Sequence, residues 1–350
     1  MVEKESMIYK NLGKSGLKVS AISLGNWLTG HNLEFEETQY QCFSKAIESG
    51  VNFLDTAEIY GFGNAETELG NILKRGEWNR DELVISTKFI KAGTKLSQTG
   101  LGRKRLIQGV RNSLKRLQLD YADIIFLHRP DQDVPIVETV RTVNHLIETG
   151  KADYWGTSEF TPAELMEVFE VCEKYGFVEP VAEQCQYNMM WRKRVEVELA
   201  PLFDHYGMGT TVWSPLMGGI LTGKYNQGIP DGTRVSDPML PAFVKQRYEE
   251  PFLPENKETT LKKLQGLGKI AEDLGCTQAQ LAIAWCMKSP DVSTAITGAT
   301  RPQQIEDTIK SVEVVEKLTP EVLNRIEEIL QTRPTPPMNW RTWELMPHRR

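Results

Sequence analysis

The sequence predicts an α/β protein in which eight parallel strands, each followed by a helix, close into a (β/α)8 TIM barrel. Short apolar runs alternate with longer amphipathic stretches about eight times over roughly 300 residues. Such alternation is typical of a parallel sheet with right-handed crossovers. No break in composition and no Gly-, Ser- or charge-rich linker divides the chain. A single closed barrel is therefore favoured over its main competitor, a doubly wound open sheet.

The first half of the chain supplies four strand–helix units. The run at 124–127 is wholly apolar, which is typical of a strand buried on both faces. Gly50 and Gly150 each follow a helical pattern, where a glycine commonly ends a helix. We expect strands at 19–24, 51–55, 83–87 and 124–127, and helices at 38–49, 65–73, 103–117 and 134–149.

The second half continues the pattern after one interruption, a Gly- and Pro-rich loop at 214–255. Thr161, Pro162 and Glu164 form a helix start, with a cap residue, a proline at the first position and an acid in the first turn. We expect strands at 154–156, 181–185, 210–213 and 292–296, and helices at 161–175, 195–206, 256–274, 277–288, 301–311 and 319–330.

The domain prediction is one barrel domain over residues 8–330, opened by an N-terminal hairpin. Residues 331–350 are rich in Pro and Arg and are expected to form an irregular C-terminal tail.

Composition excludes several classes of protein. The 350 residues carry 41 Lys and Arg against 47 Asp and Glu, a net charge of −6, so no electrostatic footprint for nucleic acid is present. The five cysteines form no CxxC pair and no histidines cluster near them, so no metal site is expected. No apolar run approaches the roughly 18–20 residues that span a bilayer, and the charged N-terminus is not a secretory signal. We expect a cytoplasmic protein without direct membrane insertion.

Four ionisable residues follow three successive predicted strands: Asp55, Tyr60, Lys88 and His128. Taken singly, each has an ordinary explanation, such as a turn or cap residue, amphipathic packing, a solvated lysine or a turn histidine. In a barrel the C-terminal strand ends meet at one mouth, where active sites lie. We therefore expect the four side chains to converge.

Their chemistry is complementary. The pKa of tyrosine, about 10, is too high for efficient proton donation near neutrality. A neighbouring ammonium lowers that pKa, a carboxylate keeps the ammonium charged, and a histidine orients a carbonyl oxygen. This set predicts a proton donor and an oxyanion site, for which a hydride-carrying cofactor is the natural complement.

Several motifs resemble those of a known family. The stretch GVNFLDTAEIY at 50–60, with Glu66 and Leu69-Gly70, is similar to the first signature of the aldo-keto reductases. Supporting stretches are YKNLGKSGLKVS at 9–20, ISTK at 85–88, RPD at 129–131, YWGTS at 154–158, WSPL at 213–216 and QLAIAWC at 280–286. The resemblance covers about residues 8–330. Within the family it is nearest to the branch that contains voltage-gated potassium-channel beta subunits.

The resemblance implies a barrel that binds NADPH/NADP+ without a Rossmann domain. In agreement, the chain has no GxGxxG motif, since the near match at 61–66 has Glu66 in place of the third glycine. The family's catalytic set carries over with Tyr60 as general acid, Lys88 as the cation that lowers its pKa and Asp55 as the partner of Lys88. His128 would orient the carbonyl group. The animal channel subunits usually have Asn at this position, so His128 favours a competent reductase.

The resemblance also implies a set of cofactor-binding residues in the loops after the strands. Among them Trp27 would form an aromatic wall of the substrate pocket, and Trp213 would stack on the nicotinamide. The others are Ser158 and Gln184 for the carboxamide, Ser214, Leu216 and Gly218 for the pyrophosphate, Lys224 and Arg234 for the clamp over the dinucleotide, and Gly298, Thr300, Gln304 and Asp307 for the adenosine phosphate.

Two further residues bear on the cofactor. Arg301, at a helix N-terminus, is an additional candidate for the 2′-phosphate, which favours NADPH over NADH. Glu159 departs from the family, which mostly has Asn there, and a carboxylate near the nicotinamide would weaken the amide contact or favour the oxidised ring.

Two functions follow as expectations. The first is NADPH-dependent reduction of a small aldehyde or ketone. The alternative is a redox-sensing accessory subunit of a voltage-gated potassium channel, with slow or no turnover. A homotetramer and contact with the cytosolic face of a channel are expected from the resemblance alone. A third reading, a barrel that binds some other ligand, is disfavoured by the four converging groups.

Overall fold

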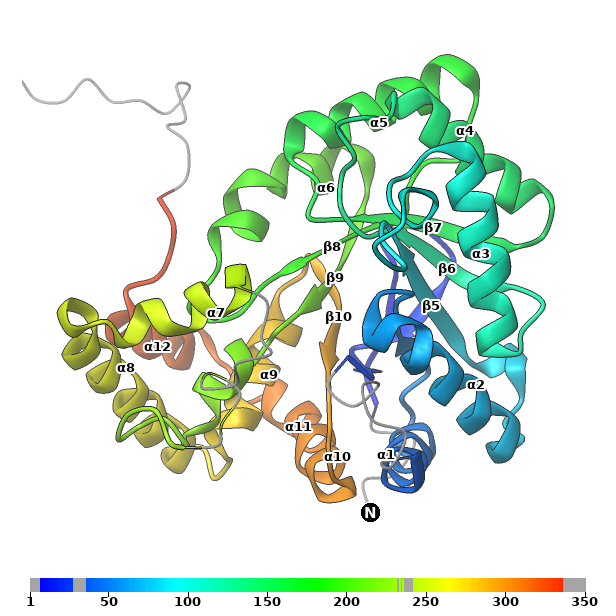
Figure 1. The fold of residues 1–350 in the computed structure, drawn as a ribbon. Coiled ribbons are helices and arrows are strands. Elements are labelled where there is room, and N and C mark those ends of the chain that lie inside the picture. Colours follow the sequence, from blue (N-terminus) through cyan, green and yellow to red (C-terminus); the bar gives the residue numbers. More distant parts are fainter. Residues whose placement is uncertain (1–6, 28–35, 232, 234, 236–241, 336–350) are drawn as a thin grey trace, which may run out of the picture.

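In the computed structural model of the chain, which describes residues 7–27, 36–231, 233, 235 and 242–335, eight parallel strands close into a barrel. Their order around the barrel is β10-β3-β4-β5-β6-β7-β8-β9 (Figure 1). The strands are β3 (Ile22–Gly25), β4 (Phe53–Asp55), β5 (Val84–Phe89), β6 (Ala122–Leu127), β7 (Ala152–Ser158), β8 (Ala182–Gln186), β9 (Gly209–Trp213) and β10 (Val292–Thr297). The predicted (β/α)8 barrel is confirmed.

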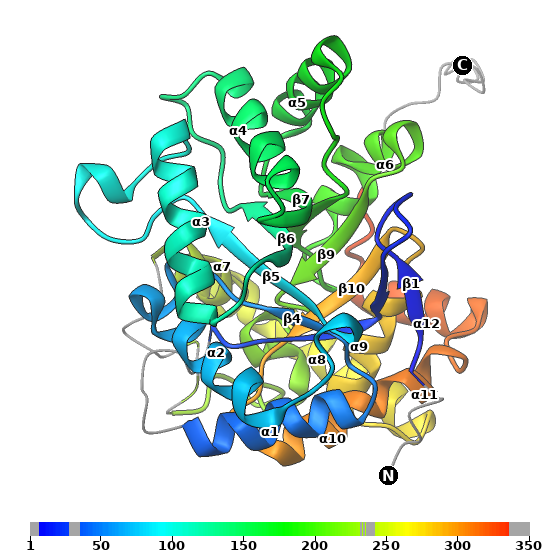
Figure 2. The same ribbon diagram turned by 90° about the vertical axis from the view of Figure 1, so that its right-hand side faces the viewer.

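Helices lie around the outside of the strands (Figures 1 and 2). They are α1 (Glu36–Glu48), α2 (Asn64–Gly76), α3 (Arg103–Leu117), α4 (Ile136–Glu148), α5 (Pro162–Tyr175), α6 (Ala200–Tyr206), α7 (Ala242–Glu249), α8 (Pro254–Asp273), α9 (Gln278–Lys288), α10 (Pro302–Ile309), α11 (Ser311–Val315) and α12 (Pro320–Leu330). The expected cap at Thr161 is present, because its hydroxyl accepts a hydrogen bond from Glu164 N.

An N-terminal hairpin of β1 (Tyr9–Asn11) and β2 (Lys18–Ser20) precedes the barrel, as expected. The strand expected at 19–24 is divided into β2 and β3 at Ala21. The N–H of Ala21 donates to Ile8 in the hairpin, whereas its carbonyl accepts from Ala295 in the barrel. Leu12 and Val19 of the hairpin pack against apolar barrel residues, among them Phe53 and Phe126. The hairpin therefore closes the end of the barrel opposite the strand C-termini.

Other departures from the expected helices have local causes. The helix expected at 195–206 begins as a π-helical turn at Arg194–Glu198 and continues as α6, where Pro201 lacks the N–H that an uninterrupted helix would use. The loop expected at 214–255 contains a 3-10 segment, Met217–Thr222, and the short helix α7. No helix in the described part of the chain is long and apolar enough to cross a membrane.

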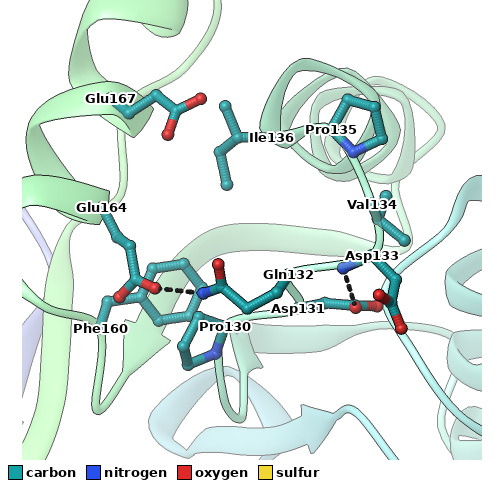
Figure 3. Close-up of a pocket in the computed structure, with 10 residues that line it drawn as sticks. All are labelled: Pro130, Asp131, Gln132, Asp133, Val134, Pro135, Ile136, Phe160, Glu164 and Glu167. Atoms are coloured by element: carbon teal, nitrogen blue, oxygen red, sulfur yellow. Dashed lines mark hydrogen bonds between the residues drawn. The ribbon is translucent and has the colours of Figure 1, made fainter.

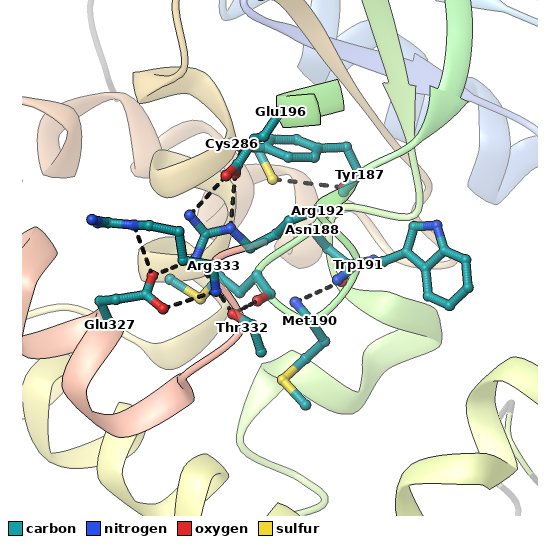
Figure 4. A network of polar contacts seen from close by, with 11 residues as sticks. Tyr187, Asn188, Met190, Trp191, Arg192, Glu196, Cys286, Glu327, Thr332 and Arg333 are labelled. Carbon is teal, nitrogen blue, oxygen red and sulfur yellow. Dashed lines mark hydrogen bonds and ion pairs between the residues drawn. The ribbon is translucent and has the colours of Figure 1, made fainter. Parts of the chain in front are cut away.

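A polar network holds the described part of the expected C-terminal tail (Figure 4). The Arg192 guanidinium donates to Glu196 and, at 2.5 Å, to Glu327 of α12. The Thr332 hydroxyl donates to the Met189 carbonyl at 2.7 Å, and Arg333 N donates to Glu327. Residues 331–335 therefore lie against the segment that follows β8. Residues 336–350 of the expected tail lie outside the described residues.

Candidate active site

A buried ion pair lies at the C-terminal ends of β4 and β5. Lys88 Nζ is 2.5 Å from Asp55 Oδ2, and the two residues are 0% and 3% exposed. Ser86 precedes Lys88 by two positions, so both side chains point to the barrel interior, and its hydroxyl donates to Asp55 Oδ1 at 2.7 Å. Burial lowers the pKa of Lys88, but the combined effects of Asp55 and Tyr60 outweigh this and raise that pKa above its usual value.

Tyr60 completes the contacts of the Lys88 ammonium. The three N–H groups of Nζ meet Asp55, the Thr56 carbonyl at 2.8 Å and the Tyr60 hydroxyl oxygen at 3.3 Å. Because the Tyr60 oxygen accepts from Lys88, its own O–H remains a donor. Burial raises the pKa of Tyr60, and the opposing effect of Lys88 does not cancel this. Lys88 thus acts in the expected direction, but burial, with a smaller contribution from Asp55, makes the net shift of the Tyr60 pKa upward.

His128 lies beside Tyr60, with the ring centroids 5.8 Å apart and the rings edge to face. Burial, together with the charges of Arg129 and Lys88, lowers the pKa of His128 well below its usual value. The imidazole is therefore neutral near pH 7, and its buried Nδ1 has no hydrogen-bond partner among the described residues. The Trp27 ring lies 6.1 Å from that of Tyr60 on the same mouth.

Gln184 and Ser158 adjoin this cluster. Gln184 Nε2 donates to Asp55 Oδ1 at 3.3 Å and to the Thr211 hydroxyl at 3.2 Å. The Arg129 guanidinium donates to the carbonyl of His128 and, at 3.1 Å, to the Ser158 hydroxyl. The structure thus brings together the four ionisable residues, Gln184 and, through Arg129, Ser158.

A second group lies at the end of β9. Trp213 Nε1 donates to Glu159 Oε1 at 2.9 Å. The Ser214 hydroxyl is 2.8 Å from the Tyr248 hydroxyl and accepts from Gly218 N. Gly218 has a φ of +65°, and a Cβ there would lie 2.4 Å from the Tyr248 ring, so only glycine fits. Leu216, in the same turn, is partly buried.

The expected adenosine-phosphate residues form a third group after β10. Gln304 Oε1 accepts from Thr300 N and Arg301 N and so caps α10. Gly298 and Asp307 are exposed, and no hydrogen bond joins this group to Asp55 or Tyr60 within the described residues. Lys224 is exposed in its loop, whereas Arg234 lies outside the described residues.

Sequence reasoning missed several residues that support the site. The interior-facing alternation of β5 was a signal for Ser86. Thr211 and Arg129 carry no comparable signal, because their partners lie on neighbouring strands. Glu58, which also follows β4, pairs with Arg105 of α3 and accepts from Ile90 N, so it ties the end of β5 to its helix.

A separate cavity of about 350 Å³ opens beside the mouth, between the β6–α4 and β7–α5 connections (Figure 3). Gln132 spans these connections by donating to Glu164 at 2.7 Å. None of the four ionisable residues lines this cavity. The described residues include no group of three or more His, Cys, Asp or Glu side chains placed to hold a metal ion.

Glu183, in β8, contacts the end of the neighbouring strand β7. Its fully buried carboxyl accepts from the Thr157 hydroxyl at 2.5 Å and from Phe160 N at 3.1 Å. Burial raises the pKa of Glu183 to about 8, and the charge of Glu159 adds to this while Arg194 opposes it. Glu183 is therefore largely protonated at neutral pH and links β8 to the end of β7.

Replacing Lys88 with Met is expected to lower the free energy of unfolding by roughly 3–5 kcal/mol, because Asp55 is left as an uncompensated buried charge. Urea denaturation measures this loss. The double variant Lys88→Met/Asp55→Asn, which removes both charges, should be more stable than Lys88→Met alone. If Asp55→Asn instead lowers the free energy of unfolding of the Lys88→Met variant further, the buried ion pair is contradicted.

Glu183→Gln tests the protonated carboxyl. Because the folded-state pKa of about 8 lies above the usual value of 4.5, the stabilising contribution of the proton is complete below pH 4.5. It is lost as the pH rises through about 8. Wild-type stability should therefore fall relative to that of Glu183→Gln across this window in thermal unfolding. Glu167→Gln, at an exposed position, is the control. If the difference in stability between wild type and Glu183→Gln does not depend on pH, as is expected for Glu167→Gln, the assignment is refuted.

Comparison with known proteins confirms the resemblance. Residues 21–331 match the model of the aldo/keto reductase family. A Schizosaccharomyces pombe protein provisionally named a voltage-gated potassium channel subunit beta is 48% identical over 335 residues, covering 95% of this chain and 96% of that protein. Proteins named in the same provisional way from Arabidopsis thaliana (44% over 339 residues, 96% and 100%) and Oryza sativa subsp. japonica (43% over 330 residues, 94% and 98%) are also similar. The chain belongs to the aldo/keto reductase family.

Proposed function

We propose that this protein reduces small aldehydes and ketones to alcohols with NADPH. Membership of the aldo/keto reductase family supports an oxidoreductase, and members use nicotinamide cofactors, commonly NADPH. The observation that carries the proposal is the orientation of the Tyr60 hydroxyl. Its oxygen accepts from a buried, Asp55-paired Lys88, which leaves the O–H to donate to a substrate.

The chain's own residues supply the proton half of the reaction. When bound, NADPH supplies a hydride from its nicotinamide C4 to the carbonyl carbon. As the new C–H bond forms, the π electrons of the carbonyl move to its oxygen, which takes the proton of Tyr60. Lys88 stabilises the phenolate that results, and water returns the proton. Nδ1 of the neutral His128 ring has no hydrogen-bond partner among the described residues, and His128 would hydrogen-bond the carbonyl oxygen of the substrate and orient it.

The described residues fit a dinucleotide. In the loop after Trp213, Gly219 has a φ of +101° and no crowding at its Cβ position, so its backbone allows close approach of a pyrophosphate, whereas the Tyr248 ring covers Gly218. Lys224 and Arg301 form no ion pair within the described part of the chain and are exposed. Arg301, at the start of α10, would bind the 2′-phosphate of NADPH, and Lys224 would be part of the clamp over the dinucleotide. Ser158, at the end of β7, and Gln184, within β8, would hold the carboxamide.

Replacing Tyr60 with Phe removes the proposed proton donor and, with it, the acceptor of one Lys88 N–H. Turnover should fall by about 10²–10⁴-fold, while NADPH binds within about twofold of wild type. Loss of NADPH absorbance with 4-nitrobenzaldehyde measures turnover, and nicotinamide fluorescence measures binding. Tyr154→Phe, at the opposite end of β7, should leave both unchanged. Turnover at the wild-type rate in Tyr60→Phe would exclude the proposed role.

A second candidate is an accessory subunit of a voltage-gated potassium channel, which the names of three relatives favour. In that case the chain would assemble, as a homotetramer, with the cytosolic domain of a channel. Size-exclusion chromatography with light scattering of the mixed, purified proteins tests this directly. A joint species supports the candidate, and separate elution at micromolar concentration counts against it.

A further inference from the structure

Glu159 occupies an unusual position at the end of β7. Its φ is +59°, in the left-handed region that glutamate rarely adopts. Such a backbone conformation persists only where the surrounding contacts hold it, and such residues gather at functional sites.

The contacts of Glu159 join three strand ends. Oε1 accepts from Gln186 N, at the end of β8, and from Trp213 Nε1, at the end of β9, each at 2.9 Å. The carboxylate therefore fixes both the separation of these ends and the orientation of the Trp213 indole at the barrel mouth.

No cation neutralises this carboxylate within the described residues. Arg194, the cation nearest along the next connection, donates to the Phe160 carbonyl and pairs with Glu198. Arg129 donates to Ser158 and to the carbonyl of His128, and Arg247 donates to Gln186 Oε1. Each of these arginines thus has partners other than Glu159.

The charge of Glu159 is not needed for its hydrogen bonds. A neutral amide oxygen could accept from the same two N–H groups, whereas a partly buried carboxylate without an ion pair is costly. A carboxylate at this position would be stabilised by a cationic group bound beside it. The nicotinamide ring is cationic when oxidised and neutral when reduced, and Trp213 is the side chain proposed to stack on it.

We infer that Glu159 is a positioning residue that orients the Trp213 indole against the nicotinamide and selectively stabilises the oxidised ring. This rests on the proposed use of NADPH. The bound cofactor is then a stronger reductant than it would be without the carboxylate, and NADP+ is released more slowly after each turnover.

The test compares the dissociation constants of NADP+ and NADPH by calorimetry at low ionic strength. In Glu159→Gln, which keeps an acceptor for Trp213 and Gln186 N, NADP+ should bind about tenfold more weakly, as expected for a lost charge at short range. NADPH should change by less than about twofold. The potential of the bound two-electron couple then rises by about 30 mV, the equivalent of tenfold.

Two further variants separate charge from structure. Glu167→Gln removes an equal charge from an exposed position on α5, at the rim of the cavity in Figure 3, and should leave the ratio of the two constants unchanged. Trp213→Phe removes the indole N–H while the carboxylate stays, and should weaken both cofactor forms.

Equal weakening of both forms in Glu159→Gln, or no change in either, would overturn the inference while leaving the proposed function standing. Failure of the wild-type protein to bind either form would instead overturn the proposed function, and the inference with it.

Discussion

The buried ion pair of Lys88 and Asp55 is the constraint on which the rest of the site depends. An ammonium without solvent must find oxygen partners on every N–H, and here Asp55, the Thr56 carbonyl and Tyr60 supply them. Parallel pairing of β4 with β5 sets Asp55 opposite Ser86, two residues before Lys88. Strand register, burial and the direction of the Tyr60 O–H are therefore linked through one side chain.

The opposite wall of the mouth has a different electrostatic character. Glu183 is buried and largely protonated, and Glu159, next to it in space, acts only as an acceptor. Beside Tyr60 lies the Lys88 ammonium, which would stabilise the phenolate that forms when Tyr60 gives up its proton. Beside Trp213 lies the Glu159 carboxylate. The two halves of a carbonyl reduction, proton and hydride, would then be served by opposite charges on opposite sides of one barrel mouth.

Much of this arrangement could be predicted from the sequence because it follows from periodicity. Alternating strands and helices indicate a barrel, and the C-terminal ends of parallel strands meet at one mouth, so Asp55, Lys88 and His128 had to converge. The sign of the Tyr60 pKa shift could not be predicted in this way. It depends on whether burial or the Lys88 charge is larger, which only the geometry decides.

Other features depended on contacts between distant segments. Ala21 divides a predicted strand because its N–H and carbonyl serve different sheets. The left-handed backbone of Glu159 and its bond to Trp213 join residues 54 positions apart. The short helix α7 carries few apolar residues at helical spacing, and it contributes Tyr248 to the Ser214 turn through tertiary packing.

The most direct test of the central claim is to follow the hydrogen that leaves the cofactor. The protein would be given NADPH labelled with deuterium at the transferable position of nicotinamide C4, together with 4-nitrobenzaldehyde, and the alcohol analysed by mass spectrometry. The wild-type protein is expected to give an alcohol with one deuterium on the carbinol carbon, and Tyr60→Phe is expected to form far less of the same labelled alcohol. An alcohol without the label, or no alcohol at all from the wild-type protein, would contradict the account.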